Sequence, residues 1–223
     1  MARDATVFSL AGLITAITLQ KRNKKRCNVY VDGEFAFALP AVDAIRLHEG
    51  YAIEDHEIEA LVARDEQQRT YNSALQFLAH RPRSTKEVED RLIKHGYSTN
   101  SIQAALERLA KHSFVNDSEF ADYWVEQRTR FRPRGKHMLR YELRQKGINE
   151  AEIESALVNV NEDELCRTLA LKWLQRDRGL PEDELNRKLT AHLARRGFAY
   201  SIIRDTLSEL ADEAGGRSTL KGD

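Results

Sequence analysis

The chain has 223 residues, 31% of them charged, and its 35 basic residues balance 35 acidic ones, so total charge indicates no partner. No apolar run is long enough to cross a membrane. Cys27 and Cys166 fit no metal or redox spacing, which favours a reducing interior, and Met1–Leu19 carries Arg3 and Asp4, unlike a signal peptide. We therefore expect a soluble cytoplasmic protein.

Residues 12–56 are predicted to form a small β-rich module after a flexible tail over residues 1–11. The expected strands, rich in β-branched and apolar residues, are Leu13–Leu19, Cys27–Val31 and Glu34–Leu39. Asp32-Gly33 between the last two is a strong hairpin signal, since both turn residues need positive φ. The module thus begins with three strands.

A short helix is predicted over Ala41–His48, stopped by Gly50. Three antiparallel strands are marginal alone, so they must pack on the helices that follow. The module either contacts a partner or caps the first repeat, and we favour capping because end repeats commonly need a dissimilar cap.

From Asp55 the apolar residues recur with the helical period, and one helix is predicted to reach Leu78. Arg81-Pro82-Arg83 ends it. Ser84 and Glu87 then have the spacing of a capping box and predict the start of the next helix.

A motif of about fifty residues occurs three times and aligns on Gly96, Gly147 and Gly197. Matching apolar positions are Val88, Leu139 and Leu189 eight residues before the glycine, Leu92, Leu143 and Leu193 four before it, and Ile102, Ile153 and Ile203 six after it. This spacing predicts a helix, a left-handed glycine stop and a second helix.

With a leading helix in front of each pair, the chain reads as three three-helix repeats over residues 57–109, 110–160 and 161–212. Residues 213–223 are predicted to be a flexible tail. The fold class is therefore mostly α, a tandem array of three repeats preceded by a small N-terminal module of a β-hairpin, a third strand and a helix.

No active-site motif is present: the chain lacks a Walker-type phosphate loop, G-x-G-x-x-G, G-x-S-x-G and H-E-x-x-H. The nearest approach to a metal cluster is His112, Asp117 and Glu119. We interpret these as a helix start, capped by Asn116 or Asp117 and closed by Glu119. We predict neither an enzyme nor a metal site.

One stretch is strongly basic. Between residues 128 and 146 only Glu142 opposes eight basic residues. They are Arg128, Arg130, Arg132, Arg134, Lys136, Arg140, Arg144 and Lys146. Phe131 and Tyr141 are interleaved with them. We predict that this basic stripe meets DNA phosphates or an acidic protein surface, the alternative being a solvated helix end and linker.

Other basic residues extend this hypothesis. Arg81 and Arg83 occupy the same inter-helix turn in the first repeat as Arg132 and Arg134 do in the second, and Arg176 and Arg178 follow in the third. A second cluster consists of Lys21, Arg22, Lys24, Lys25 and Arg26. This cluster is either a solubilising loop or a contact surface.

The sequence resembles the RecX family, whose members regulate the RecA recombinase. The resemblance is carried by ALQFLAHRPRS (Ala74–Ser84), Glu87 to Leu92, Phe114–Asp117 with Phe120 and Ala121, Arg128 to Gly135, Leu139, Glu142-Leu143 and Lys146-Gly147-Ile148. VYVDGEFAFAL (Val29–Leu39) is similar to a hairpin that some members carry. The resemblance is strongest over the first two repeats.

This resemblance implies an array of three-helix repeats that binds in the groove of the RecA–single-stranded DNA filament and generally inhibits it. ATP hydrolysis, strand exchange and stimulated repressor cleavage would all fall. It implies no catalytic role and no cofactor, and a place in DNA repair by homologous recombination and in the SOS response. We expect a monomer that contacts single-stranded DNA weakly or through the filament.

Two alternatives remain at this point. The chain is either a RecA-filament regulator or a general nucleic-acid-binding repeat protein without a recombinase partner. A nuclease that uses Asp117 and Glu119 would be a third class, but it fails the motif search. Because the resemblance assigns no role to each arginine, the predicted site residues rest on charge alone.

Overall fold

The computed structural model of the protein describes residues 10–176 and 181–219, so the expectations for residues 1–9, Arg178 and residues 220–223 lie outside the described chain. The described chain forms two compact units. One combines the chain up to residue 80 with residues 88–114, and the other combines residues 81–87 with the chain from residue 115 onwards.

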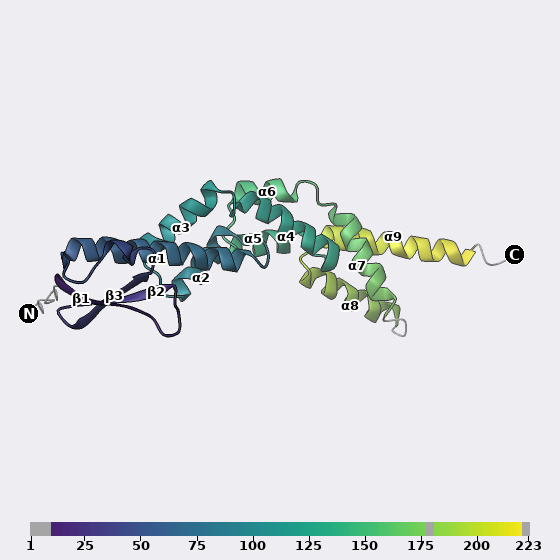
Figure 1. Cartoon of the computed structure of the whole chain (residues 1–223). Helices are drawn as coiled ribbons and strands as arrows, with labels where there is room; N and C mark the ends of the chain where they lie inside the picture. The colour runs from purple at the N-terminus through teal and green to yellow at the C-terminus, as the bar shows by residue number, and fades with distance from the viewer. Residues whose placement is uncertain (1–9, 177–180, 220–223) are drawn as a thin grey trace, which may run out of the picture. The chain divides into compact units, whose positions relative to one another are not determined.

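The first unit begins with an antiparallel sheet of strand order β3-β2-β1-β4. Its strands are β1 (Gly12–Leu19), β2 (Arg26–Val31), β3 (Glu34–Pro40) and β4 (Ala52–Ile53). Strands β1, β2 and β3 are labelled near the N-terminus in Figure 1. The predicted hairpin joins β2 to β3, with φ of 49° at Asp32 and 86° at Gly33. The fourth strand, β4, was not predicted because two residues carry no periodic signal.

Two local predictions in this module differ from the structure. The segment Ala41–His48 contains only a 3-10 turn, Ala44–Arg46. Val42 and Ile45 are 73% and 79% exposed, and only Ala44 and Leu47 pack inward, so little apolar surface is buried that would stabilise a longer helix. Leu10 and Ala11, which the prediction placed in a flexible tail, are held in place, because their N–H groups donate to the Asp55 carboxylate at 2.7 and 2.8 Å.

Helix α1 (Asp55–Leu78) is the predicted uninterrupted helix, and it contains neither glycine nor proline. It packs against β3 and against α3 (Thr99–Lys111), and α2 (Thr85–Lys94) completes the first repeat. Its sheet-facing core includes Ile14, Val29, Leu39, Ile53 and Ile58. Buried side chains of the first repeat are Tyr71, Ala74, Val88, Leu92, Ile102, Ala105 and Leu109.

The second unit holds two further three-helix repeats. Their helices are α4 (Asp117–Phe131), α5 (Lys136–Gln145), α6 (Glu150–Leu157), α7 (Glu162–Leu174), α8 (Glu182–Arg195) and α9 (Tyr200–Thr219). Each repeat has its own core, one around Leu139, Leu143 and Ile153 and the other around Leu189, Leu193 and Ile203. Helix α9 continues to Thr219, where the sequence predicted a tail from residue 213.

The three glycine stops are confirmed, since φ is 79° at Gly96, 79° at Gly147 and 86° at Gly197. The aligned apolar positions around them are buried in all three repeats. The predicted fold class is therefore confirmed. Within the described chain, no helix is both long and apolar enough to span a membrane.

Candidate functional site

Part of the basic stripe turns inward onto one acid, Glu142 on α5. Its Oε2 accepts hydrogen bonds from Arg128 Nε at 2.6 Å and from Trp124 Nε1 at 2.9 Å. The Arg128 guanidinium also lies over the Trp124 ring, 4.2 Å from its centroid. Arg128 is therefore engaged within its own repeat.

Two more residues of the stripe pair with helix α6. Arg140 donates to Glu154 at 2.7 Å, and Arg144 donates through two nitrogens to Glu150 at 2.8 and 3.0 Å. The hydrogen bonds from Arg144 lower the pKa of Glu150, and those from Glu150 raise the pKa of Arg144. These partners lie four and eight residues beyond the stripe, so a count of charge inside it overstates what a ligand would meet.

Arg81 also has an internal partner. It donates to both carboxylate oxygens of Glu87, at 2.9 and 3.1 Å. Lys146 reaches the same carboxylate. Burial of Glu87 opposes its ionisation, but hydrogen bonds from Arg81 and Lys146 outweigh burial and lower the pKa of Glu87. Arg83 is half-buried in the same turn.

The structure brings two further stripe arginines, Arg132 and Arg134, together with cations from the third repeat. We call the result the basic groove, with a cavity volume of about 630 Å³. Its lining residues are Phe131, Arg132, Pro133, Arg134, Leu169, Lys172, Trp173, Arg176, His192, Arg195 and Arg196. Six carry a permanent positive charge, and no carboxylate is among them. Such a surface attracts anions.

One wall of the groove is the linker between α4 and α5, held against the end of α8. The N–H of Gly135 donates to the carbonyl oxygen of Arg196 at 3.0 Å. The backbones approach so closely that a Cβ on Gly135 would overlap the backbone of Gly197. This joint places Arg132 and Arg134 beside Arg195 and Arg196.

The cations of the groove destabilise one another. Burial, followed by the charges of Arg134 and Arg132, lowers the pKa of Arg196. Burial and the charges of Arg196 and Arg195 lower the pKa of His192. Arg134 Nε lies 3.6 Å from Glu142 Oε1 and is a buried donor without a hydrogen-bond partner. An anion in the groove would relieve this repulsion.

Other predicted site residues lie apart from the groove. Arg130 is exposed, and its guanidinium lies 5.3 Å from the centroid of the Phe131 ring. Lys136 is half-buried at the start of α5. Its backbone N–H donates to Glu162 Oε1 at 3.0 Å.

The second basic cluster also contains exposed residues together with one that is paired inside the protein. Lys21, Arg22, Lys24 and Lys25 are exposed in the loop between β1 and β2. Arg26 is the first residue of β2, so it does not belong to the loop as predicted. It donates to both oxygens of Asp65 at 2.8 and 2.7 Å. Since Asp65 is only 7% exposed, this pair is part of the core.

Sequence reasoning missed most of the groove. Lys172, Trp173, His192, Arg195 and Arg196 were not proposed as a site. Arg195 and Arg196 precede Gly197, where basic residues also suit the dipole of a helix end, so their position alone does not indicate binding. Only the fold brings them to Arg132.

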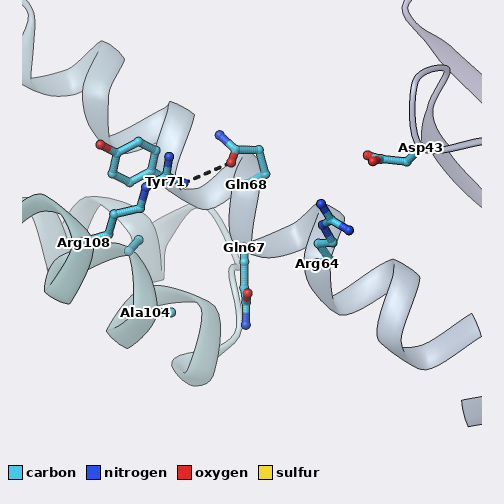
Figure 2. Close-up of a pocket in the computed structure, with 8 residues that line it drawn as sticks. Asp43, Arg64, Gln67, Gln68, Tyr71, Ala104 and Arg108 are labelled. Carbon is cyan, nitrogen blue, oxygen red and sulfur yellow. Dashed lines mark hydrogen bonds between the residues drawn. The ribbon is translucent and has the colours of Figure 1, made fainter. Parts of the chain in front are cut away.

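A second hollow lies in the first unit, between α1 and α3, with a volume of about 290 Å³ (Figure 2). The Arg108 guanidinium lies over the Tyr71 ring, 3.8 Å from its centroid, and donates to Gln68 Oε1 at 3.1 Å, the dashed line in Figure 2. Asp43 also lines this hollow. With one acid and an arginine already engaged, it suits an anion less well than the basic groove does.

Protein-family models match the N-terminal module and the three repeats one after another along the chain. The chain matches the RecX regulatory protein N-terminal domain over residues 12–54. It matches the first, second and third RecX three-helix domains over residues 71–109, 116–157 and 161–207. The family models therefore cover both the sheet and the three repeats.

Curated relatives and solved structures that are similar to this chain belong to the same family as these models. Regulatory protein RecX of Bacillus subtilis (strain 168) is 33% identical over 205 residues, which are 90% of this chain and 78% of the relative. That of Clostridium botulinum (strain Eklund 17B / Type B) is 30% identical over 88% of this chain and 95% of the relative. A crystal structure of regulatory protein RecX has a TM-score of 0.64 at 30% identity, covering 88% of this chain and 100% of that one. RecX from Lactobacillus salivarius gives 0.60 at 28% identity, covering 66% and 98%.

Proposed function

Since the chain belongs to the RecX family of regulatory proteins, we propose that it binds the filament formed by RecA on single-stranded DNA and inhibits its ATP hydrolysis, strand exchange and co-protease activity. The protein performs no chemistry of its own in this proposal. It acts by binding.

The observation that carries the proposal is the basic groove. A nucleoprotein filament exposes phosphates and carboxylates, and a groove lined by six permanent cations without a carboxylate is complementary to such a surface. Arg132 and Arg195 are exposed at this groove and available to a partner.

Inhibition by binding needs no catalytic group. A ligand shifts an equilibrium between two states of its partner by the difference in its affinity for them. A regulator that binds the inactive state of the filament more tightly than the active one lowers every activity that depends on the active state. ATP hydrolysis, strand exchange and co-protease activity would then fall together.

The test is ATP hydrolysis by the cognate RecA on single-stranded DNA, titrated with this protein. We expect inhibition at less than one protein per RecA monomer. The variant Arg132→Glu/Arg195→Glu should inhibit far more weakly. The control Arg187→Glu/Arg204→Glu reverses two exposed charges of the same unit outside the groove and should inhibit as the natural chain does. Wild-type protein that leaves hydrolysis unchanged would contradict the proposal.

A second candidate is a general nucleic-acid-binding repeat protein with no recombinase partner. Two aromatic rings, Phe131 and Trp173, line the groove beside its cations, which is the composition of a nucleic-acid surface. This candidate predicts tight binding to bare single-stranded DNA with a steep salt dependence, together with no effect on RecA.

A further inference from the structure

The second unit contains two joints between repeats that are built on the same plan. Each begins with an Arg-Pro-Arg linker located 15 to 13 residues before a glycine stop, Arg81–Arg83 before Gly96 and Arg132–Arg134 before Gly147. The helix after the linker is capped by an acid from the next repeat. Asp117 accepts from the N–H of Thr85 at 2.8 Å, and Glu162 accepts from that of Lys136 at 3.0 Å.

The close contact at the end of the next repeat's middle helix is also shared. A Cβ on Gly147 would lie 2.8 Å from the Cβ of Lys86, and one on Gly197 would lie 2.4 Å from the Cβ of Met138. The two joints share this plan, although the facing residue shifts by one position, from Lys86, ten residues before Gly96, to Met138, nine before Gly147. They can therefore be compared side chain by side chain.

At the first joint two carboxylates neutralise the cations. Glu87 accepts from Arg81 and Lys146. Glu142 accepts from Arg128 and from the indole of Trp124, and its other oxygen lies 3.6 Å from Arg134 of the second linker. The first joint thus holds its positive charges in internal ion pairs.

At the second joint both carboxylates are replaced. Glu87 lies nine residues before its glycine stop, and the residue nine before Gly147 is Met138. Glu142 lies five residues before its own stop, and the residue five before Gly197 is His192, whose ring lies 6.4 Å from that of Trp173. The linker arginines are kept, but no carboxylate lines the second joint. Among the described residues, its lining cations reach one carboxylate only, Glu142, which lies 3.6 Å from Arg134 Nε.

We propose that the phosphate backbone of single-stranded nucleic acid binds in the basic groove and replaces these two carboxylates. The groove is strongly cationic, its arginines repel one another, and Arg134 Nε is a buried donor without a hydrogen-bond partner. A phosphodiester chain supplies repeated negative charge and acceptor oxygens to such a surface.

The aromatic residues select a single strand over a duplex and over an acidic peptide. The Phe131 side chain is 63% exposed, and Trp173 is half-buried in the same lining. Unpaired bases stack on such rings beside the phosphate contacts, whereas a duplex keeps its base faces covered. A carboxylate-rich peptide would use the cations but leave the rings without a partner.

This inference rests on the proposed function and deepens it, because the groove would hold the DNA of the filament and leave RecA to other surfaces. The test restores the acids of the first joint in the full-length protein, as Met138→Glu/His192→Glu. The matched control, Met138→Gln/His192→Gln, has the same shape without the charges. Circular dichroism and thermal unfolding establish that both variants are folded.

Binding is measured by fluorescence anisotropy with a labelled oligothymidylate in the absence of RecA. We expect the glutamate variant to lose affinity by roughly tenfold or more, with a shallower salt dependence, and the glutamine variant to bind as the natural chain does. A third variant, Trp173→Leu, should lose affinity on the order of tenfold with an unchanged salt slope, because stacking is not an ionic contact.

Equal binding by the glutamate variant and the natural chain would overturn the proposal, as would tighter binding to a duplex of the same length. The same proteins are then tested for inhibition of RecA. If the natural chain fails to inhibit RecA but the glutamate variant loses DNA affinity, the filament proposal fails and the groove assignment stands. If the natural chain inhibits RecA and its DNA binding is unaffected by the glutamates, the groove assignment alone fails.

Discussion

A Cβ atom on Gly135 would lie 2.2 Å from the carbonyl oxygen of Gly197, so the linker after α4 rests directly on the backbone that ends α8. No side chain fits between them. This contact fixes one wall of the basic groove and depends on glycine at both positions.

Replacing Gly197 with alanine should therefore destabilise the protein more than replacing Gly96. Both glycines have a positive φ, which costs an alanine about 1–2 kcal/mol. At Gly96 a Cβ meets nothing within 4 Å, whereas at Gly197 it meets Met138 Cβ at 2.4 Å, and overpacking adds about 1–3 kcal/mol. Urea unfolding of the two variants measures the difference. Equal losses would show that the joint relaxes around a methyl group.

Asp65→Ala should lower the free energy of unfolding by about 3 kcal/mol, because it leaves the Arg26 guanidinium, only 20% exposed, without its carboxylate. The double variant Arg26→Met/Asp65→Leu should regain most of this loss, since it removes both charges. Lys25→Met, at the exposed neighbouring position, serves as the control. A double variant no more stable than Asp65→Ala would argue against an uncompensated charge as the cause.

Acidification should weaken the first joint through Glu87. Its pKa in the folded chain is lower than the ordinary value of 4.5, so the folded chain holds this proton less tightly than the unfolded chain does. The stabilisation is therefore present above pH 4.5 and is lost as the pH falls through the lowered pKa. The difference in unfolding free energy between the natural chain and Glu87→Gln should shrink as the pH falls below 4.5. A difference that stays constant with pH would exclude this ionisation as its source.

Glu162→Ala should cost about 1 kcal/mol, because the N–H of Lys136 at the start of α5 loses its acceptor. Asp163→Ala is the matched control, being an exposed acid in the same first turn of α7. Hydrogen exchange at the first turn of α5 should accelerate in the first variant and stay unchanged in the second. Equal exchange in both would mean that the contact between the repeats does not hold this turn.

Much of the fold could be predicted because its signals are local. The glycine stop needs one residue with positive φ, and the buried positions of each helix pair are four residues apart, so both appear directly in the sequence. Strand β4 and the length of α9 depend on tertiary contacts. Arg167 in α7, for example, donates to Glu213 of α9 at 2.8 Å.

The site was harder to predict, because ion pairs and groove walls join distant segments. A basic stripe suggests that all of its arginines bind the same ligand. In the structure, Arg128 donates to Glu142 of its own repeat, whereas Arg132 lines the groove. Lys146 reaches Glu87 across 59 residues of sequence. Arg132 and Arg195 belong to different repeats, and only the contact of Gly135 with Gly197 makes them neighbours.

The caps at Thr85 and Lys136 make a helix of each of the first two repeats depend on the repeat that follows it in the sequence. In both cases the acceptor belongs to the following repeat, so a helix start is completed by residues that leave the ribosome later. During synthesis, the first turn of α2 must wait for Asp117 and that of α5 for Glu162. A nonsense or frameshift lesion late in the gene would therefore damage the repeat before it as well as the one it removes.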